Sequence, residues 1–133
     1  VHLGGIEGRV EATGRGVQYA LREFFRHPDD IKKAKLRGSL DGKKIIIQGL
    51  GNVGYHAAKF LSEEDGAKII KVIERGGSIS NNSGINIEDL KQHLHNGLPL
   101  KEYKEGLLEV VASNPLVAPP IPVMCVPNPA AVP

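Results

Sequence analysis

Disulfides and membrane-spanning helices are two features that this 133-residue sequence does not supply. Cys125 is its only cysteine, so no internal disulfide can form and nothing indicates an oxidising compartment. No apolar run approaches the roughly 18 residues of a membrane-spanning helix, and no signal-peptide pattern opens the chain. We therefore expect no membrane partner and a cytoplasmic protein, or a mitochondrial one if a transit peptide is missing.

An excess of charge of one sign is also missing. Lys plus Arg number 17 and Asp plus Glu number 15, which gives a net charge of +2. This balance excludes a strongly basic nucleic-acid-binding protein, so the basic run at 32–37 is expected to be the solvated end of a helix. The five histidines follow no metal-ligand spacing, and we expect no metal site.

Glycine and proline, by contrast, are unevenly abundant. The chain has 16 glycines and nine prolines, and seven of the prolines fall in residues 115–133. Residues 110–133 also carry no charged side chain. Because proline removes backbone hydrogen bonds from helices and strands, we expect residues 1–111 to form the folded part and residues 112–133 an irregular tail.

The first third of the chain is predicted to be helical. Apolar residues recur at helical spacing in 17–25, and this helix should end at His27, because Pro28 disfavours helical backbone in the residue before it. A short second helix is expected to begin at Pro28 and to be closed by Gly38.

The middle of the chain has the pattern of a strand–turn–helix–strand unit. A β-branched run at 43–48 leads into the glycine turn 49–54, a helical stripe then reaches about residue 65, and a second strand is predicted at 67–74. Such a unit has parallel strands. The sequence therefore predicts an α/β fold, a partial Rossmann-type dinucleotide-binding domain with parallel strands that is preceded by a long N-terminal helix.

Beyond the second strand the pattern is weaker. Turn residues flank the β-prone segment 78–80, which suggests a small hairpin. A helix is expected at 87–95 with Asn86 as its N-cap, and a further helix running into a strand within 101–111.

Gly49, Gly51 and Gly54 form the pattern G-x-G-x-x-G between a predicted strand and a predicted helix. In a dinucleotide-binding turn the first glycine allows the tight turn, the second lets backbone approach a pyrophosphate, and the third lets the helix pack closely on the strand. Glu74 ends the next strand, where a carboxylate accepts hydrogen bonds from the ribose hydroxyls. The alternative is a glycine-rich turn in some other α/β protein.

The preference between NAD and NADP stays open at this stage. Glu74 favours NAD, because a carboxylate repels the 2′-phosphate of NADP. Arg75 follows it directly, and a guanidinium there is able to pair with that phosphate.

A second glycine pattern precedes the first helix, in the segment Gly-Arg-Val-Glu-Ala-Thr-Gly-Arg-Gly-Val at 8–17. Each glycine inside a helix costs about 1 kcal/mol relative to alanine, so something is expected to approach this backbone closely. The alternative is a loose, glycine-rich lead-in to a helix. Arg15 is able to pair with Glu11, four residues before it, and we assign it no further role.

Together with Ile-Gln-Gly-Leu-Gly-Asn-Val-Gly at 47–54, this segment closely resembles the glutamate dehydrogenases, of the wider glutamate, leucine, phenylalanine and valine dehydrogenase superfamily. The resemblance runs from about Leu3 to Glu109. It implies that Arg9 holds the substrate α-carboxylate and that Thr13 lies beside the nicotinamide. By the same resemblance the ribose contact is Glu74, and the pyrophosphate turn matches Gly51, Asn52 and Val53.

The resemblance implies a reaction whose catalytic residues lie elsewhere. The family deaminates glutamate reversibly to 2-oxoglutarate and ammonia with NAD or NADP, and its catalytic lysine and aspartate belong to a separate substrate domain. We therefore expect no catalytic residue here, an inactive isolated chain, and a homo-oligomeric parent enzyme, a hexamer by family. Since the sequence departs from the family after Glu109, a fragment or a mis-spliced or frame-shifted product is one hypothesis. The other function considered is an inert, partial nucleotide-binding module.

Overall fold

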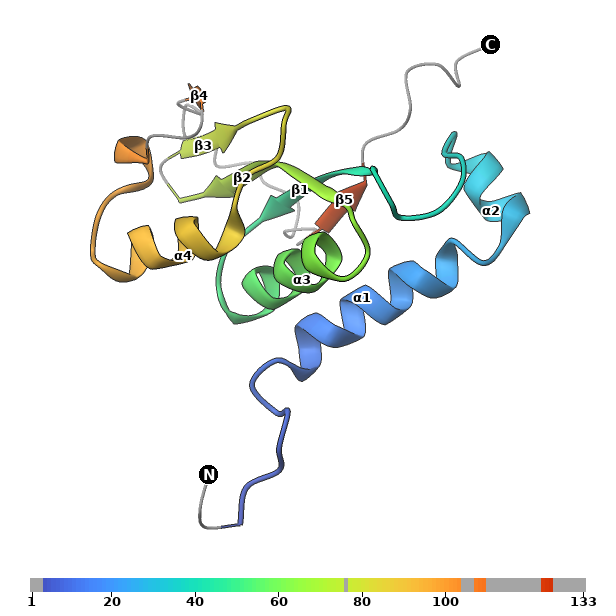
Figure 1. Ribbon diagram of the computed structural model, residues 1–133, viewed down its shortest axis with the longest axis horizontal. Helices are drawn as coiled ribbons and strands as arrows, with labels where there is room; N and C mark the ends of the chain where they lie inside the picture. Colours follow the sequence, from blue (N-terminus) through green and yellow to red (C-terminus); the bar gives the residue numbers. More distant parts are fainter. Residues whose placement is uncertain (1–3, 76, 104–106, 110–122, 126–133) are drawn as a thin grey trace.

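The computed structural model describes residues 4–75, 77–103, 107–109 and 123–125, in which helices and strands are mixed along the chain (Figure 1). The helices are α1 (Ala12–Phe24), α2 (Pro28–Lys33), α3 (Asn52–Glu63), α4 (Ile87–His95) and the 3-10 turn η1 (Leu100–Glu102). The strands are β1 (Lys44–Gln48), β2 (Lys68–Glu74), β3 (Gly77–Ser80), β4 (Leu107–Glu109) and β5 (Val123–Cys125). The predicted α/β class is confirmed.

The strands of the described residues form one sheet in the order β4-β3-β2-β1-β5. β1 and β2 are parallel and are joined through α3, as the strand–turn–helix–strand pattern predicted. The other three pairings are antiparallel, so the expectation of parallel strands holds only for the central pair. Only two residues separate β2 from β3, whereas a parallel neighbour needs a crossover of about a dozen, so β3 turns back as a hairpin.

The core lies between the sheet and α3, and α1 packs on α3 in turn (Figure 1). Ile45 and Ile47 of β1, Leu61 of α3 and Val72 of β2 have no exposed surface. The two isoleucines alternate along the strand, so both point to the same face. This packing fixes α3 on the sheet, and with it the turn that joins β1 to α3.

The end of α1 and the start of α2 are set by the local sequence. α1 ends at Phe24, earlier than the expected His27, and Phe25 and Arg26 form a turn. His27 is extended, with φ −108° and ψ 96°, as the residue before a proline should be. Pro28 opens α2, as predicted, and the N-cap role of Asn86 in α4 is confirmed because its side chain accepts the Asp89 N–H at 3.2 Å.

Two expectations near the end of the chain are wrong in part. In place of the helix expected within 101–111 there is the short turn η1, with β4 after it. The tail was expected to be irregular, yet Val123–Cys125 form β5, which pairs with β1. No proline falls in these three residues, so each keeps the N–H that a sheet requires.

Candidate functional site

The turn Gly49–Gly54 carries β1 into α3, and its three motif glycines have three different environments. Gly49 has a φ of +84°, a left-handed conformation that favours glycine. Gly54 is buried, and a Cβ there would overlap the Gly49 carbonyl oxygen. Gly51 is exposed and extended, and a Cβ there would meet nothing within 4 Å. The first and third glycines thus serve the turn itself, whereas the second leaves bare backbone facing open space.

Helix α3 begins directly after that exposed backbone. Gly51 is its N-cap and supplies no side-chain hydrogen bond, and the first turn holds no acidic residue. The N–H groups of Asn52, Val53 and Gly54 have no partner within the helix, because the first intrahelical bond runs from the Tyr55 N–H to the Gly51 carbonyl. Unpaired N–H groups and the positive end of the helix dipole favour an anion at this position.

Glu74 lies at the same turn. Its Oε1 accepts a hydrogen bond from the Leu50 N–H, and the Ile73 carbonyl accepts one from the Gly49 N–H at 2.8 Å. These bonds join the end of β2 to the turn after β1. The carboxylate is half-buried, and its second oxygen accepts no hydrogen bond from the described residues. A carboxylate with a free oxygen therefore stands beside the exposed backbone of Gly51.

A lysine that the sequence did not single out reaches this turn from α4. The Lys91 ammonium donates to the Leu50 carbonyl, with an Nζ–O distance of 3.2 Å. It also lies 5.3 Å from the centre of the Tyr55 ring. No local pattern distinguishes Lys91 from the other lysines of the chain, because its position depends on how α4 packs against α3.

The two glycine-rich segments meet in the structure. The Asn52 side chain donates to the Val10 carbonyl, with an Nδ2–O distance of 2.7 Å. A Cβ on Gly14 would lie 2.5 Å from the His56 Cβ and 2.8 Å from the Ala57 backbone nitrogen. The close approach expected near Gly14 is therefore made by helix α3, at the crossing of the two helices.

The two N-terminal residues assigned by resemblance lie beside this crossing. Arg9 precedes Val10, and Thr13 precedes Gly14 in the first turn of α1. Both side chains are exposed to solvent. The structure thus brings the N-terminal pair and the glycine turn to the same end of α3.

The Arg15 guanidinium pairs with Glu64 at 2.5 Å and forms no ion pair with Glu11, the expected partner, among the described residues. The Glu11 carbonyl accepts the backbone N–H of Arg15 at 2.9 Å. The Arg15 guanidinium lies 3.4 Å from the centre of the Phe60 ring. Gln18, which has no exposed surface, accepts a hydrogen bond from Arg15 at 2.9 Å. The hydrogen bond from Arg15 lowers the pKa of Glu64, and the same bond raises the pKa of Arg15. This cluster fastens α1 to the far end of α3 and belongs to the scaffold of the site.

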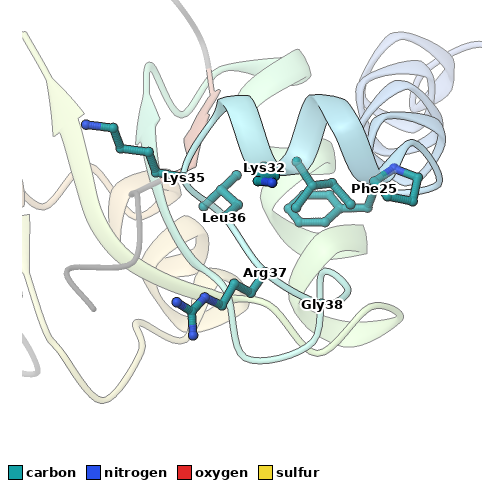
Figure 2. A pocket seen from close by; sticks show the side chains of 8 residues that line it. Phe25, Lys32, Lys35, Leu36, Arg37 and Gly38 are labelled. Atoms are coloured by element: carbon teal, nitrogen blue, oxygen red, sulfur yellow. The ribbon is translucent and has the colours of Figure 1, made fainter. Parts of the chain in front are cut away.

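A cavity of about 620 Å³ lies elsewhere, between Phe25, which follows α1, and residues of α2 and of the segment after it (Figure 2). Phe25 and Leu36 flank it, whereas the charged ends of Lys35 and Arg37 point away from the Phe25 ring. None of its lining residues belongs to the glycine turn. Within the ranges that the structure describes, no helix has the length and apolarity to cross a bilayer. No group of three His, Cys, Asp or Glu side chains in those ranges has the arrangement of a metal site.

A comparison with models of protein families matches residues 4–132 to the glutamate/leucine/phenylalanine/valine dehydrogenases. The chain belongs to this family. Residues after Glu109, where the resemblance was expected to end, lie inside the matched range. The assignment made from the two glycine segments is therefore confirmed at the level of the family.

Individual proteins that are similar to this chain are also glutamate dehydrogenases. Mitochondrial glutamate dehydrogenase of Dictyostelium discoideum is 51% identical over 93 residues, which are 70% of this chain. A probable glutamate dehydrogenase of Sinorhizobium fredii is 52% identical over 92 residues, or 68% of this chain, and the glutamate dehydrogenase of Aeropyrum pernix is 37% identical over 106 residues, or 80%. These alignments cover only 18%, 20% and 23% of the respective relatives.

The fold is also found in a solved member of the family. The hetero-hexameric glutamate dehydrogenase of Thermus thermophilus, in its leucine-bound form, superposes with a TM-score of 0.58 at 29% identity. The superposition covers 74% of this chain and 22% of that one. The chain thus spans about a fifth of the length of its relatives, and it has the partial Rossmann-like fold predicted for it.

Proposed function

We propose that this chain is the NAD(P)-binding segment of a glutamate dehydrogenase. The observation that carries the proposal is the backbone of Gly51, which is exposed and free of a side chain and stands directly before the uncapped start of α3. A pyrophosphate fits this arrangement, because nothing lies within 4 Å of the position that a Cβ on Gly51 would take.

Different residues of this chain are proposed to bind different parts of the cofactor. The N–H groups of Asn52 and Val53 donate to the pyrophosphate, since they have no partner within the helix. The free oxygen of Glu74 accepts from the ribose hydroxyls. Thr13, at the crossing of α1 and α3, lies on the nicotinamide side. These residues bind and orient a cofactor that, when bound, takes a hydride from glutamate.

This chain is proposed to supply only part of the substrate-binding site. Arg9 is the residue proposed to hold the α-carboxylate of glutamate, a role that suits the planar fork of a guanidinium. The groups that move protons during deamination are proposed to come from the substrate domain of the complete enzyme. We propose an oligomeric parent enzyme, located in the cytoplasm or, like the Dictyostelium relative by its name, in the mitochondrion.

The test is to substitute the exposed glycine and to measure binding of NAD and NADP by calorimetry. Gly51→Val should abolish measurable binding, because a branched side chain fills the space proposed for the pyrophosphate. The fold should persist, since Gly51 has a φ of −76° and its Cβ position is open. Its far-UV circular dichroism should match the unsubstituted chain.

Gly16→Val is the matched control. Gly16 is likewise exposed, and a Cβ there also meets nothing within 4 Å, but it lies on α1 away from the turn. This variant should keep its affinity for both cofactors. Unchanged affinity in Gly51→Val would overturn the pyrophosphate assignment.

A further inference from the structure

Lys91 is held in place by the packing of its own helix. Its neighbour Leu90 has no exposed surface, and Asn86 caps the start of α4. From this fixed helix the Lys91 ammonium reaches back to the Leu50 carbonyl, 3.2 Å away. A flexible side chain is thereby kept at the glycine turn.

Two side chains of opposite charge form hydrogen bonds with the backbone of Leu50. Glu74 accepts from its N–H, and Lys91 donates to its carbonyl. The two charges do not pair with each other, and within the described ranges neither of them forms an ion pair. Lys59 is different, because its ammonium pairs with Glu88 at 3.4 Å. The Lys91 ammonium is therefore held by no ion pair among the described residues, and it has N–H donors to spare at the ribose end of the site.

We propose that Lys91 binds the 2′-phosphate of NADP, an inference that rests on the proposed function. The ribose is assigned to Glu74, and a phosphate on its 2′-oxygen adds negative charge beside that carboxylate. The Lys91 ammonium, on the other side of Leu50, offsets this repulsion and donates to the phosphate oxygens. Arg75 is the other cation near Glu74, but its side chain is exposed, whereas Lys91 is fixed by contacts to Leu50 and Tyr55.

The test compares two probes that differ by the 2′-phosphate alone: adenosine 2′,5′-bisphosphate and adenosine 5′-monophosphate. Calorimetry on the full chain should show that Lys91→Gln weakens binding of the bisphosphate about tenfold and changes binding of the monophosphate less than about twofold. Lys91→Arg keeps the positive charge and should recover most of the loss. Circular dichroism of each variant should match that of the unsubstituted chain.

Two further variants make the result specific. Lys68→Gln removes a positive charge at the opposite end of β2 and should leave the ratio of the two affinities unchanged. Arg75→Gln should change that ratio less than Lys91→Gln does. The inference is wrong if the ratio is unaffected in Lys91→Gln, or if it falls only in Arg75→Gln. If neither probe binds the unsubstituted chain, the proposed function itself fails and the inference fails with it.

Discussion

Gly14 and Gly16 are two residues apart in α1 and have opposite environments. A Cβ on Gly14 would meet the backbone of α3 at 2.8 Å, while Gly16 faces open space. Gly14→Ala should therefore destabilise the chain by about 1–3 kcal/mol, because the two helices must separate to admit a methyl group. Urea denaturation followed by circular dichroism measures the loss.

The matched variant is Gly16→Ala. Alanine at an open helix position removes the glycine penalty, so this change should stabilise the chain by up to about 1 kcal/mol. Equal effects of the two substitutions would contradict the crossing of α1 on α3 at Gly14.

For single residues, the sequence predicts those whose role depends on their neighbours along the chain. The three glycines of the turn follow a spacing that specifies the conformation, the open backbone and the close packing that the structure shows at Gly49, Gly51 and Gly54. Lys91 and Gln18 were not predictable, because each is defined by a partner more than 40 residues away along the chain. A single sequence carries no local signal for such contacts.

At the scale of elements, a polar cluster joins α1 to the end of α3. Gln18 is fully buried and donates to Glu64 at 2.9 Å and to Asp65 at 2.8 Å. Gln18→Met conserves most of the volume but removes hydrogen bonds to two carboxylates, so the free energy of unfolding should fall by about 1–3 kcal/mol. Gln92→Met, on the exposed side of α4, should change it by less than about 0.5 kcal/mol. If Gln18→Met lowered the free energy of unfolding less than Gln92→Met does, Gln18 would not join α1 to α3 as described.

The same cluster predicts a dependence of stability on acid. Hydrogen bonds from Arg15 and Gln18 lower the pKa of Glu64 below its ordinary value of 4.5. A carboxyl whose pKa is lowered by folding stabilises the fold above pH 4.5, and this contribution is lost as the pH falls through the pKa of the folded state. Glu64→Gln should therefore be least stable relative to the unsubstituted chain near neutral pH.

The difference between these two proteins should shrink as the pH falls below 4.5, and thermal melts across the acid range measure it. Glu63→Gln, an exposed neighbour on α3, is the control. A stability difference for Glu64→Gln that is constant with pH would show that the ion pair with Arg15 does not carry this effect.

Elements with a strong local pattern were predictable, and those that depend on a distant partner were not. The strand–turn–helix–strand unit follows from the β-branched runs, the glycine turn and the helical spacing in residues 43–74. β5 consists of three residues from a proline-rich segment, and only its pairing with β1 defines it as a strand. The antiparallel direction of β3 is set by its short connection to β2, and it agrees with the small hairpin that the turn residues around 78–80 suggested.

For the whole molecule, the chain covers about a fifth of the length of its relatives. The roles proposed for its residues are binding roles, and none of them is catalytic. The full chain alone should therefore bind NAD or NADP and show no glutamate-dependent reduction of either. Absorbance of the reduced nicotinamide measures turnover, with an intact glutamate dehydrogenase as the positive control. Turnover by this chain would show that the catalytic groups are not confined to a separate substrate domain.

The hydrogen bonds that Glu74 and Lys91 form with the Leu50 backbone bear on the entropy cost of the proposed cofactor binding. The side chain of Leu50 is only 3% exposed, and its N–H and carbonyl are both hydrogen-bonded to side chains. A loop residue anchored at all three points has little conformational freedom to lose when a ligand arrives, so the turn is preorganised. The Leu50 amide proton should exchange with solvent as slowly as those of the neighbouring strand, with or without the cofactor.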